Sequence, residues 1–157
     1  MKQIILFASI SIASGLLFTN LYNSLIDTKS WGSNIPDSIA VARNYFKNVN
    51  PGNFYRIFSP LNQLLALLAV ILFWKSPSPV RFSLVFALVF YVLADVLTFA
   101  YFYPRNEIMF KTAQLTDVDL LKRTWTEWNT MNWVRTSIVA LGLCFSFFSL
   151  HKIFLLR

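Results

Sequence analysis

Residues 57–103 read IFSPLNQLLALLAVILFWKSPSPVRFSLVFALVFYVLADVLTFAYFY and contain two long apolar runs. The runs Ile57–Trp74 and Phe82–Tyr103 are each long enough for a helix to cross a bilayer core, which takes about 20 predominantly apolar residues. A short link with two prolines separates them, and Pro104 is expected to end the second run. The segment therefore predicts two membrane-spanning helices that form a tight hairpin.

Two more apolar runs, Ile4–Ile26 and Asn132–Phe154, flank this hairpin. Hydrophobic residues make up 56% of the chain and charged residues only 13%, a composition that disfavours a water-soluble protein. The first run is too long for the apolar region of a secretory signal, about 7–15 residues, so we expect it to be retained. The sequence predicts an all-α fold with a single transmembrane domain over residues 1–157. Its expected architecture is an integral membrane four-helix bundle with up-down-up-down threading.

Two longer polar connections, Asp27–Arg56 and Arg105–Met131, join the spans, and each is expected to contain a short amphipathic helix. The first of these helices is predicted at Asp37–Phe46. The second is predicted to take Thr116 as its N-cap, because acidic residues follow in its first turn. We expect it to run without a break into the fourth span.

The distribution of charge predicts the orientation of the bundle. The threading places both termini and the short link on one side of the membrane, and both long connections on the other. The first side carries five basic residues and no acid, whereas the nine basic residues of the second side are accompanied by six acids. Because basic residues in short loops favour the cytoplasmic side, we predict a multi-pass protein with cytoplasmic termini. The five residues are Lys2, Lys75, Arg81, Lys152 and Arg157.

The same threading brings the polar side chains of all four spans to a similar depth, near the long connections. Since a helix rises about 1.5 Å per residue, the ends of spans one and three and the starts of spans two and four share one half of the membrane. The opposite half of each span holds nothing more polar than serine. This clustering predicts one polar pocket between the helices. Its candidate ligand-binding residues are Asn20, Asn23, Asn62, Gln63, Tyr91, Asn106 and Trp128, and its candidate catalytic residues are Asp95, Asn132 and Arg135.

Asp95 is the most expensive of these residues to place in a membrane. An unpaired carboxylate at the centre of a span costs roughly 2.5–3.5 kcal/mol on the scale of translocon insertion. Arg135 is the expected partner, because spans three and four are antiparallel neighbours and the two residues lie in corresponding halves. Such a pair can be a structural clamp or a working carboxylate, and the two roles are compatible.

The sequence offers little for other kinds of site. Cys144 is the single cysteine and His151 the single histidine, and His151 lies near the terminus opposite the polar cluster. We therefore expect no metal, no cofactor and no nucleophilic Cys/His pair. No basic face with a recognition motif is evident, so nucleic acid is not an expected partner. The expected partners are membrane lipids and a lipophilic small molecule, and a homo-oligomer remains open.

Two short motifs carry a resemblance to a known family. Tyr103–Glu107 has a Pro-x-Asn step after the third span, and Trp128–Thr136 has a Trp-x3-polar-x2-Arg-Thr step entering the fourth. Together with Gly15–Tyr22 and Asn62, they resemble the anthrone oxygenase-like family of small four-span membrane proteins, many of unknown function. The resemblance implies an oxygenase-like activity without a metal. It also implies a histidine at the polar position of the second motif, where this chain has Asn132.

Three functions follow as alternatives. The first is an oxygenase-like enzyme for a lipophilic aromatic molecule, with Asp95 as the base and Asn62, Asn106 or Arg135 stabilising the oxyanion. The second is a non-catalytic module that binds a lipid, an apolar ligand or a partner protein through the same pocket. The third, ranked well behind the others, is a small proton-coupled exporter in which Asp95 titrates.

Overall fold

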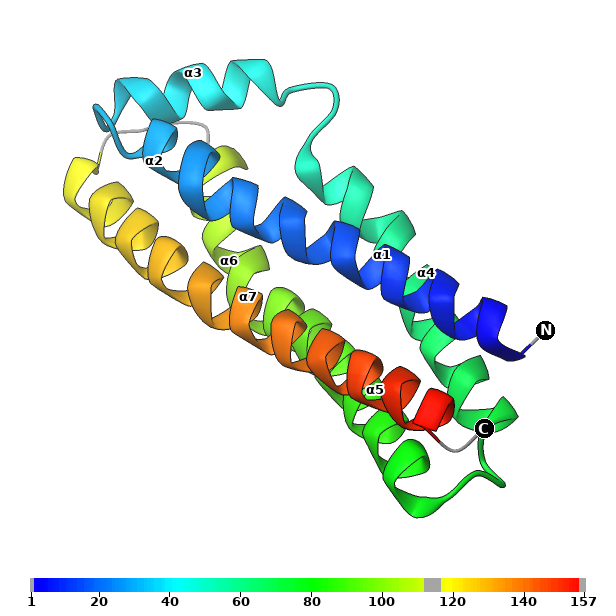
Figure 1. The fold of residues 1–157 in the computed structure, drawn as a ribbon. Helices are drawn as coiled ribbons and strands as arrows, with labels where there is room; N and C mark the ends of the chain where they lie inside the picture. Colours follow the sequence, from blue (N-terminus) through cyan, green and yellow to red (C-terminus); the bar gives the residue numbers. More distant parts are fainter. Residues whose placement is uncertain (1, 112–116, 156–157) are drawn as a thin grey trace.

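The computed structural model describes residues 2–111 and 117–155, and these residues form helices without any strand. Four long helical rods run back and forth in an elongated bundle (Figure 1). The first and third rods change helical register along their length, and one short helix stands apart. The elements are α1 (Lys2–Tyr22), η1 (Asn23–Asp27) and α2 (Thr28–Trp31) in the first rod; α3 (Asp37–Tyr45); α4 (Pro51–Leu72); α5 (Ser78–Leu97), η2 (Thr98–Phe102), α6 (Tyr103–Asn106) and η3 (Glu107–Lys111) in the third; and α7 (Val118–Leu155).

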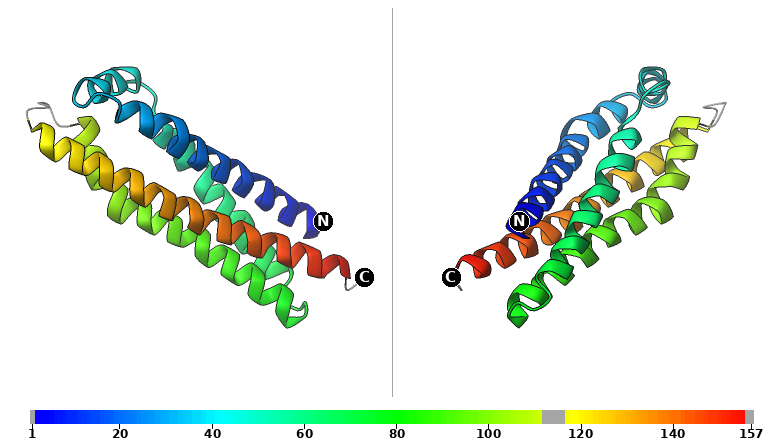
Figure 2. Two further views of the ribbon diagram at one scale, coloured as in Figure 1. Left: turned by 60° about the vertical axis from the view of Figure 1, so that its left-hand side comes forward. Right: turned by 90° about the vertical axis from the view of Figure 1, so that its right-hand side faces the viewer.

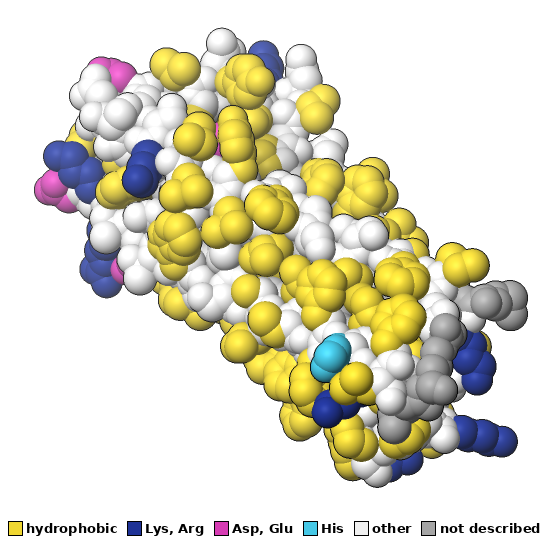
Figure 3. All heavy atoms as spheres, in the orientation of Figure 1, with side chains coloured by type: hydrophobic (Ala, Val, Ile, Leu, Met, Phe, Trp, Pro, Cys, Tyr) yellow, Lys and Arg dark blue, Asp and Glu magenta, His cyan; other side chains and the backbone are white. Residues whose placement is uncertain are grey.

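The surface of the bundle is suited to lipid. All four rods are long and apolar enough to cross a membrane. Large hydrophobic side chains such as Leu64, Ile71 and Phe86 are at least half exposed, and in water a continuous apolar surface of this kind would drive association. Figure 3 shows such side chains along the bundle, with most Lys and Arg at its two ends. The protein is therefore a multi-pass membrane protein, as predicted.

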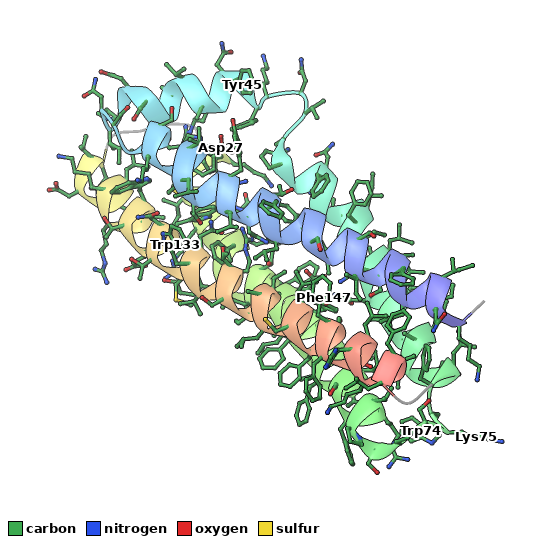
Figure 4. All side chains as sticks on the ribbon, in the orientation of Figure 1. Asp27, Tyr45, Trp74, Lys75, Trp133 and Phe147 are labelled. Carbon is green, nitrogen blue, oxygen red and sulfur yellow. The ribbon has the colours of Figure 1, made fainter. Side chains whose placement is uncertain are left out.

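The rods pack in the order that up-and-down threading requires. α5 lies along α7, α4 against α5, and α1 against both α4 and α7 (Figures 1 and 2). Both termini lie at the end of the bundle where α4 and α5 are joined, and α3 crosses the opposite end, which we call the loop end. Figure 4 places Trp74 and Lys75 at the first end and Tyr45 and Asp27 at the loop end.

The rods are longer than the predicted spans, and Pro104 does not end the third. The helix continues through Pro104 to Lys111, because η2 is a π-turn in which the Tyr103 N–H bonds to Thr98 O. A new α-helical turn begins at Tyr103, and proline is tolerated in a first turn, where the missing N–H has no intrahelical acceptor to lose. The prediction that Pro104 stops the span was therefore wrong.

The remaining ends follow from capping. α4 begins at Pro51, earlier than the predicted Ile57, because the Asn50 side chain accepts from Gly52 N at 2.9 Å and Pro51 fits the first turn. α3 is confirmed close to its predicted bounds. α7 runs unbroken into the fourth span, as predicted, and Asp117 Oδ1 accepts from Leu120 N at 2.8 Å. The predicted cap Thr116 lies outside the described residues.

Candidate functional site

Two cavities occupy the loop-end half of the bundle. The inner cavity, of about 30 Å³, lies between the four rods, and the loop-end cavity, of about 410 Å³, lies beneath α3. Tyr55, Thr98 and Arg135 line both, so these side chains form a shared wall. The predicted polar residues divide between them: Asn20, Asn62, Gln63, Tyr91 and Asp95 line the inner cavity, whereas Asn23, Asn106 and Trp128 line the loop-end cavity.

Asp95 faces the inner cavity and is held by α4. Gln63 Nε2 donates to its Oδ2 at 2.7 Å, and the Ser59 hydroxyl, one turn earlier on α4, also bonds the carboxylate. These donors replace part of the hydration that a carboxylate loses inside a membrane. Asp95 therefore has hydrogen-bond partners between the rods and forms no ion pair, although the Arg135 guanidinium attracts it electrostatically from beyond ion-pair distance.

The other amides of the inner cavity hold neighbouring rods together. Asn62 Oδ1 accepts from Ser9 Oγ at 3.2 Å, which joins α4 to α1. The Tyr55 hydroxyl donates to Asn20 Oδ1 at 3.3 Å, again between α4 and α1. The Tyr91 and Ser146 hydroxyls lie 3.0 Å apart and join α5 to α7. These bonds satisfy buried polar groups that would otherwise destabilise the bundle.

The expected ion pair between Asp95 and Arg135 is not formed. Both residues line the inner cavity, but the ion pairs of the described residues do not include them. Asp95 takes its bonds from α4, whereas Arg135 donates to Asn132 Oδ1 at 2.6 Å and to Thr98 Oγ1 at 3.4 Å. The predicted depth of the two residues in the membrane was correct, since both border the same cavity. Each side chain, however, points in a direction set by the rotation of its helix, and these directions give the two residues different partners.

Arg135 is a buried cation with incomplete hydrogen bonding. Its exposed fraction is 6%, and its Nε has no hydrogen-bond partner. The guanidinium carbon lies 4.2 Å from the ring centroid of Phe102 and 5.3 Å from that of Tyr55. Cation–π contacts of this kind contribute roughly 0.5–2 kcal/mol each, which offsets only part of the cost of burying a charge.

Asn132 positions this guanidinium. Its Nδ2 donates to Ser24 Oγ at 2.6 Å, which fixes the amide so that Oδ1 is left facing Arg135. The side chain is fully buried and lines neither of the two cavities. Of the three candidate catalytic residues, Asn132 therefore does not line a cavity and acts on the site only by positioning Arg135.

Aromatic rings cluster around the loop-end cavity. Trp128 packs edge-on against Trp31 and Phe102, with centroids 5.4 and 5.1 Å apart, and Phe110 packs against Trp31 at 5.1 Å. Trp128 Nε1 donates to Asn106 Oδ1 at 2.9 Å, which joins α6 to α7. These two residues of the sequence motifs thus meet at the cavity wall.

α3 covers the loop-end cavity and is tied to the third rod by Arg43. The Arg43 guanidinium donates to the carbonyls of Met109 at 2.6 Å and Ile108 at 3.2 Å. Carbonyls at the end of a helix lack partners within the helix, so an arginine fork serves as a cap there. The lining residues near α3 are mainly basic: Arg43, Lys47, Arg56 and Lys111, with Glu107 as an acid among them.

Several lining residues were missed by the sequence analysis. Tyr55 continues the face of α4 that carries Ser59 and Gln63, so its spacing of four residues from Ser59 could have revealed it once the helix was extended to Pro51. Arg43 and Phe110 carry no such signal. Arg43 reaches the site only because α3 folds over the third rod, and Phe110 only because the third rod continues past Pro104. Among the described residues, no group of three His, Cys, Asp or Glu could hold a metal ion.

Comparison with known proteins gives one match. The family model of the anthrone oxygenases matches residues 53–145, more than half of the chain, including α5 and most of α4 and α7. Among curated proteins and solved structures, none matches. The matched region carries Asp95, Asn106, Trp128 and Arg135, whereas Asn20 and Asn23 precede it. This chain belongs to the anthrone oxygenase family.

Proposed function

We propose that the protein oxidises a lipophilic hydroxylated aromatic molecule with dioxygen, after binding the anion of that molecule in the loop-end cavity. The observation that carries the proposal is the Arg135 guanidinium, which is buried in the wall of the cavity without a carboxylate partner and with its Nε unbonded. A buried cation of this kind is stabilised by an anion that arrives with the ligand.

The shape and lining of the cavity support an aromatic ligand. A volume of about 410 Å³ lies within the range of small-molecule sites, roughly 300–1,000 Å³. Rings of Trp31, Phe110 and Trp128 offer flat apolar contact, and the surrounding basic residues favour negative charge. A phenolate or enolate on a fused-ring system satisfies both requirements.

The family name suggests the reaction. An anthrone has a CH₂ group between two aromatic rings and opposite a ring carbonyl, and loss of one CH₂ proton gives an enolate whose charge lies partly on that oxygen. The enolate reacts with O₂, and the net change is CH₂ + O₂ → C=O + H₂O. Arg135 would lower the energy of the enolate by placing a fixed positive charge at its oxygen, which is the function of an oxyanion hole.

A second candidate function, ligand binding without turnover, is favoured by a specific observation. Glu107 is the carboxylate among the described residues that line the loop-end cavity, and it is exposed and ion-paired with Lys111. A carboxylate held by a lysine in solvent is a poor base for carbon acids. If no other group accepts the CH₂ proton of the substrate, the cavity binds an anion that has already formed but does not generate it.

The test uses the purified protein in detergent with 1,8-dihydroxyanthrone, following oxygen uptake and quinone absorbance above the protein-free rate. We expect one O₂ consumed per quinone formed. Arg135→Gln should lower kcat/KM by about 10²-fold or more, the usual range for removing an oxyanion donor. Its thermal midpoint should fall little, because the substitution removes a buried charge that forms no ion pair.

The controls separate the two candidate functions. Binding is measured with 1,8-dihydroxyanthraquinone, which resembles the product, through quenching of tryptophan fluorescence. Binding without oxygen uptake would leave the ligand-binding function in place and refute the oxygenase. If neither is detected, the cavity is not a site for this class of molecule. Arg123→Gln serves as the matched control, since Arg123 lies on the same helix as Arg135, is exposed and lines neither cavity.

A further inference from the structure

We infer that Asp95 is the proton acceptor of the proposed oxygenase and that it acts across the shared wall, through water held in the inner cavity. The inference rests on the proposed function and adds the base that the loop-end cavity lacks. Asp95 lines the inner cavity only, so it does not contact a ligand bound beneath α3. A proton must therefore cross the wall formed by Tyr55, Thr98 and Arg135.

The inner cavity has the size and lining to hold water. Its volume of about 30 Å³ is enough for one or two water molecules, since about 10–15 Å³ suffices for one. A stable buried water needs two to four polar partners, and this cavity offers amides, hydroxyls and a carboxylate from the first three rods and a guanidinium from α7. A ligand the size of a fused-ring aromatic does not fit there.

The wall between the two cavities is polar. Thr98 Oγ1 and the Tyr55 hydroxyl lie on it beside the Arg135 guanidinium, and all three residues border both spaces. The CH₂ carbon lies across the central ring from the oxygen that Arg135 would bind, so in the proposed pose the ring lies along the wall toward Tyr55, whose ring centroid is 5.3 Å from the guanidinium carbon. Thr98 Oγ1 donates to Ala94 O at 2.8 Å and the Tyr55 hydroxyl donates to Asn20 Oδ1 at 3.3 Å, so in the proposed path it is water in the inner cavity that carries the proton to Asp95.

The surroundings of Asp95 suit a proton acceptor better than a member of a structural ion pair. Gln63 and Ser59 orient its carboxylate from α4, and no cation lies within ion-pair distance of it among the described residues. The titratable and charged groups that share the inner cavity are Tyr55 on α4, Tyr91 on α5 and Arg135 on α7, while α1 contributes Leu16 and Asn20. Asp95 is the carboxylate among them.

The proton balance closes around one catalytic cycle. A C–H bond of the substrate CH₂ breaks, its electron pair stays on the enolate, and the proton passes to a water that gives one of its own protons to Asp95. After O₂ adds to the carbon, Asp95 returns its proton by the same route and the peroxide anion becomes a hydroperoxide. Loss of the second CH₂ proton then breaks the O–O bond, and the expelled hydroxide takes up that proton to form water. The carboxylate is regenerated.

The experiment compares Asp95→Asn and Asp95→Glu with the wild type in detergent, with 1,8-dihydroxyanthrone as substrate. We expect Asp95→Asn to lower kcat by about 10²-fold or more, the usual contribution of a general base, while the Kd for 1,8-dihydroxyanthraquinone changes less than about threefold. Asp95→Glu should recover much of the loss. The matched control is Ser83→Ala on the same helix, whose hydroxyl bonds only to Pro79 O and which lines neither cavity; it should turn over like the wild type.

A second readout separates proton transfer from damage to the fold. Above the pH at which the substrate ionises in solution, no base is needed, so the ratio of wild-type to Asp95→Asn turnover should approach one. A ratio that stays large at every pH, or an Asp95→Asn variant as active as the wild type, would overturn the inference while leaving the proposed function in place. A wild-type protein that binds the quinone without turnover would overturn both. If Asp95→Asn loses quinone binding, Ser59→Ala is used instead, because it removes one of the two side chains that orient the Asp95 carboxylate. An unchanged kcat in Ser59→Ala would overturn the inference that Asp95 accepts the proton through water.

Discussion

Arg135 holds its position because Asn132, one turn earlier on α7, supplies an acceptor that is itself fixed by Ser24. The side chain is thus preorganised without being neutralised. A carboxylate at the same place would form an ion pair and remove the attraction for an external anion. The family histidine that the sequence motif implies at this position would alter that balance with its protonation state, whereas asparagine keeps Arg135 charged and available.

Asn132→Asp tests this role at the scale of one residue. The new carboxylate would lie next to the Arg135 guanidinium and neutralise it, so the affinity for 1,8-dihydroxyanthraquinone should fall by about tenfold or more, which corresponds to about 1.4 kcal/mol. The thermal midpoint should stay at or above that of the wild type, because the buried cation gains a partner. Fluorescence titration and thermal unfolding measure the two effects. Asn129→Asp, with the same change of charge one turn nearer the loop end, is the control; equal loss of affinity in both variants would contradict the role of Asn132.

At the scale of elements, the sequence predicted which segments are helical but not where they change register. Apolar run length was enough to predict four spans, and the patterning of residues 37–46 was enough to predict α3. The π-turns η1, η2 and η3 leave no mark on hydropathy, because they add a residue to a turn without changing its composition. η2 in particular turns the helix so that Asn106 beyond it meets Trp128.

α5 and α7 approach each other closely where Gly142 faces the Tyr91 ring. A Cβ added at Gly142 on α7 would lie 2.7 Å from the Tyr91 ring on α5 and 3.2 Å from the Phe90 Cβ, whereas a Cβ at Gly15 on α1 would meet nothing within 4 Å. Gly142→Ala should therefore lower the free energy of unfolding by about 1–3 kcal/mol through overpacking. Gly15→Ala should leave it unchanged or raise it by up to about 1 kcal/mol, since alanine favours the helix.

The pair of glycine variants is compared by unfolding in mixed micelles, with far-UV circular dichroism to confirm that both are helical. Because Tyr91 also lines the inner cavity, the Gly142 variant should displace its ring and lower turnover as well. A Gly142→Ala protein as stable as Gly15→Ala would show that α5 and α7 are farther apart in the membrane than in this structure.

For the whole molecule, the up-and-down threading explains why the sequence could predict the depth of the site but not the contacts within it. Alternating helix direction fixed the depth of Asn62, Asp95 and Arg135, and they do border one cavity. Rotation about each helix axis decided the partners instead, which is why Asp95 bonds Gln63 rather than Arg135. The loop-end cavity was not predicted, because it depends on α3 folding over residues more than 60 positions away in the chain, as the Arg43 bonds to Ile108 and Met109 illustrate.

The two differently charged ends of the bundle predict its orientation in the membrane. The end with the termini has Lys2, Lys75, Arg81 and Lys152 and no acid, whereas acids accompany the basic residues at the loop end. The positive-inside rule predicts that the terminal end is cytoplasmic and that the loop-end cavity opens toward the opposite side. The molecule is convenient for labelling, because replacing its single cysteine, Cys144, by serine removes every native thiol.

In that background, Asn48→Cys marks the loop end and Ser78→Cys marks the terminal end, both at exposed positions. A maleimide that does not cross membranes should label Asn48→Cys on intact cells and label Ser78→Cys only after permeabilisation. The reverse pattern would invert the orientation, and the substrate would then reach the loop-end cavity from the cytoplasm. Substituting Lys75 and Arg81 by glutamine removes half of the described basic residues at the terminal end. A measurable fraction of molecules should then show the reverse labelling pattern, because these residues lie in the short loop, where positive charge acts most strongly on orientation.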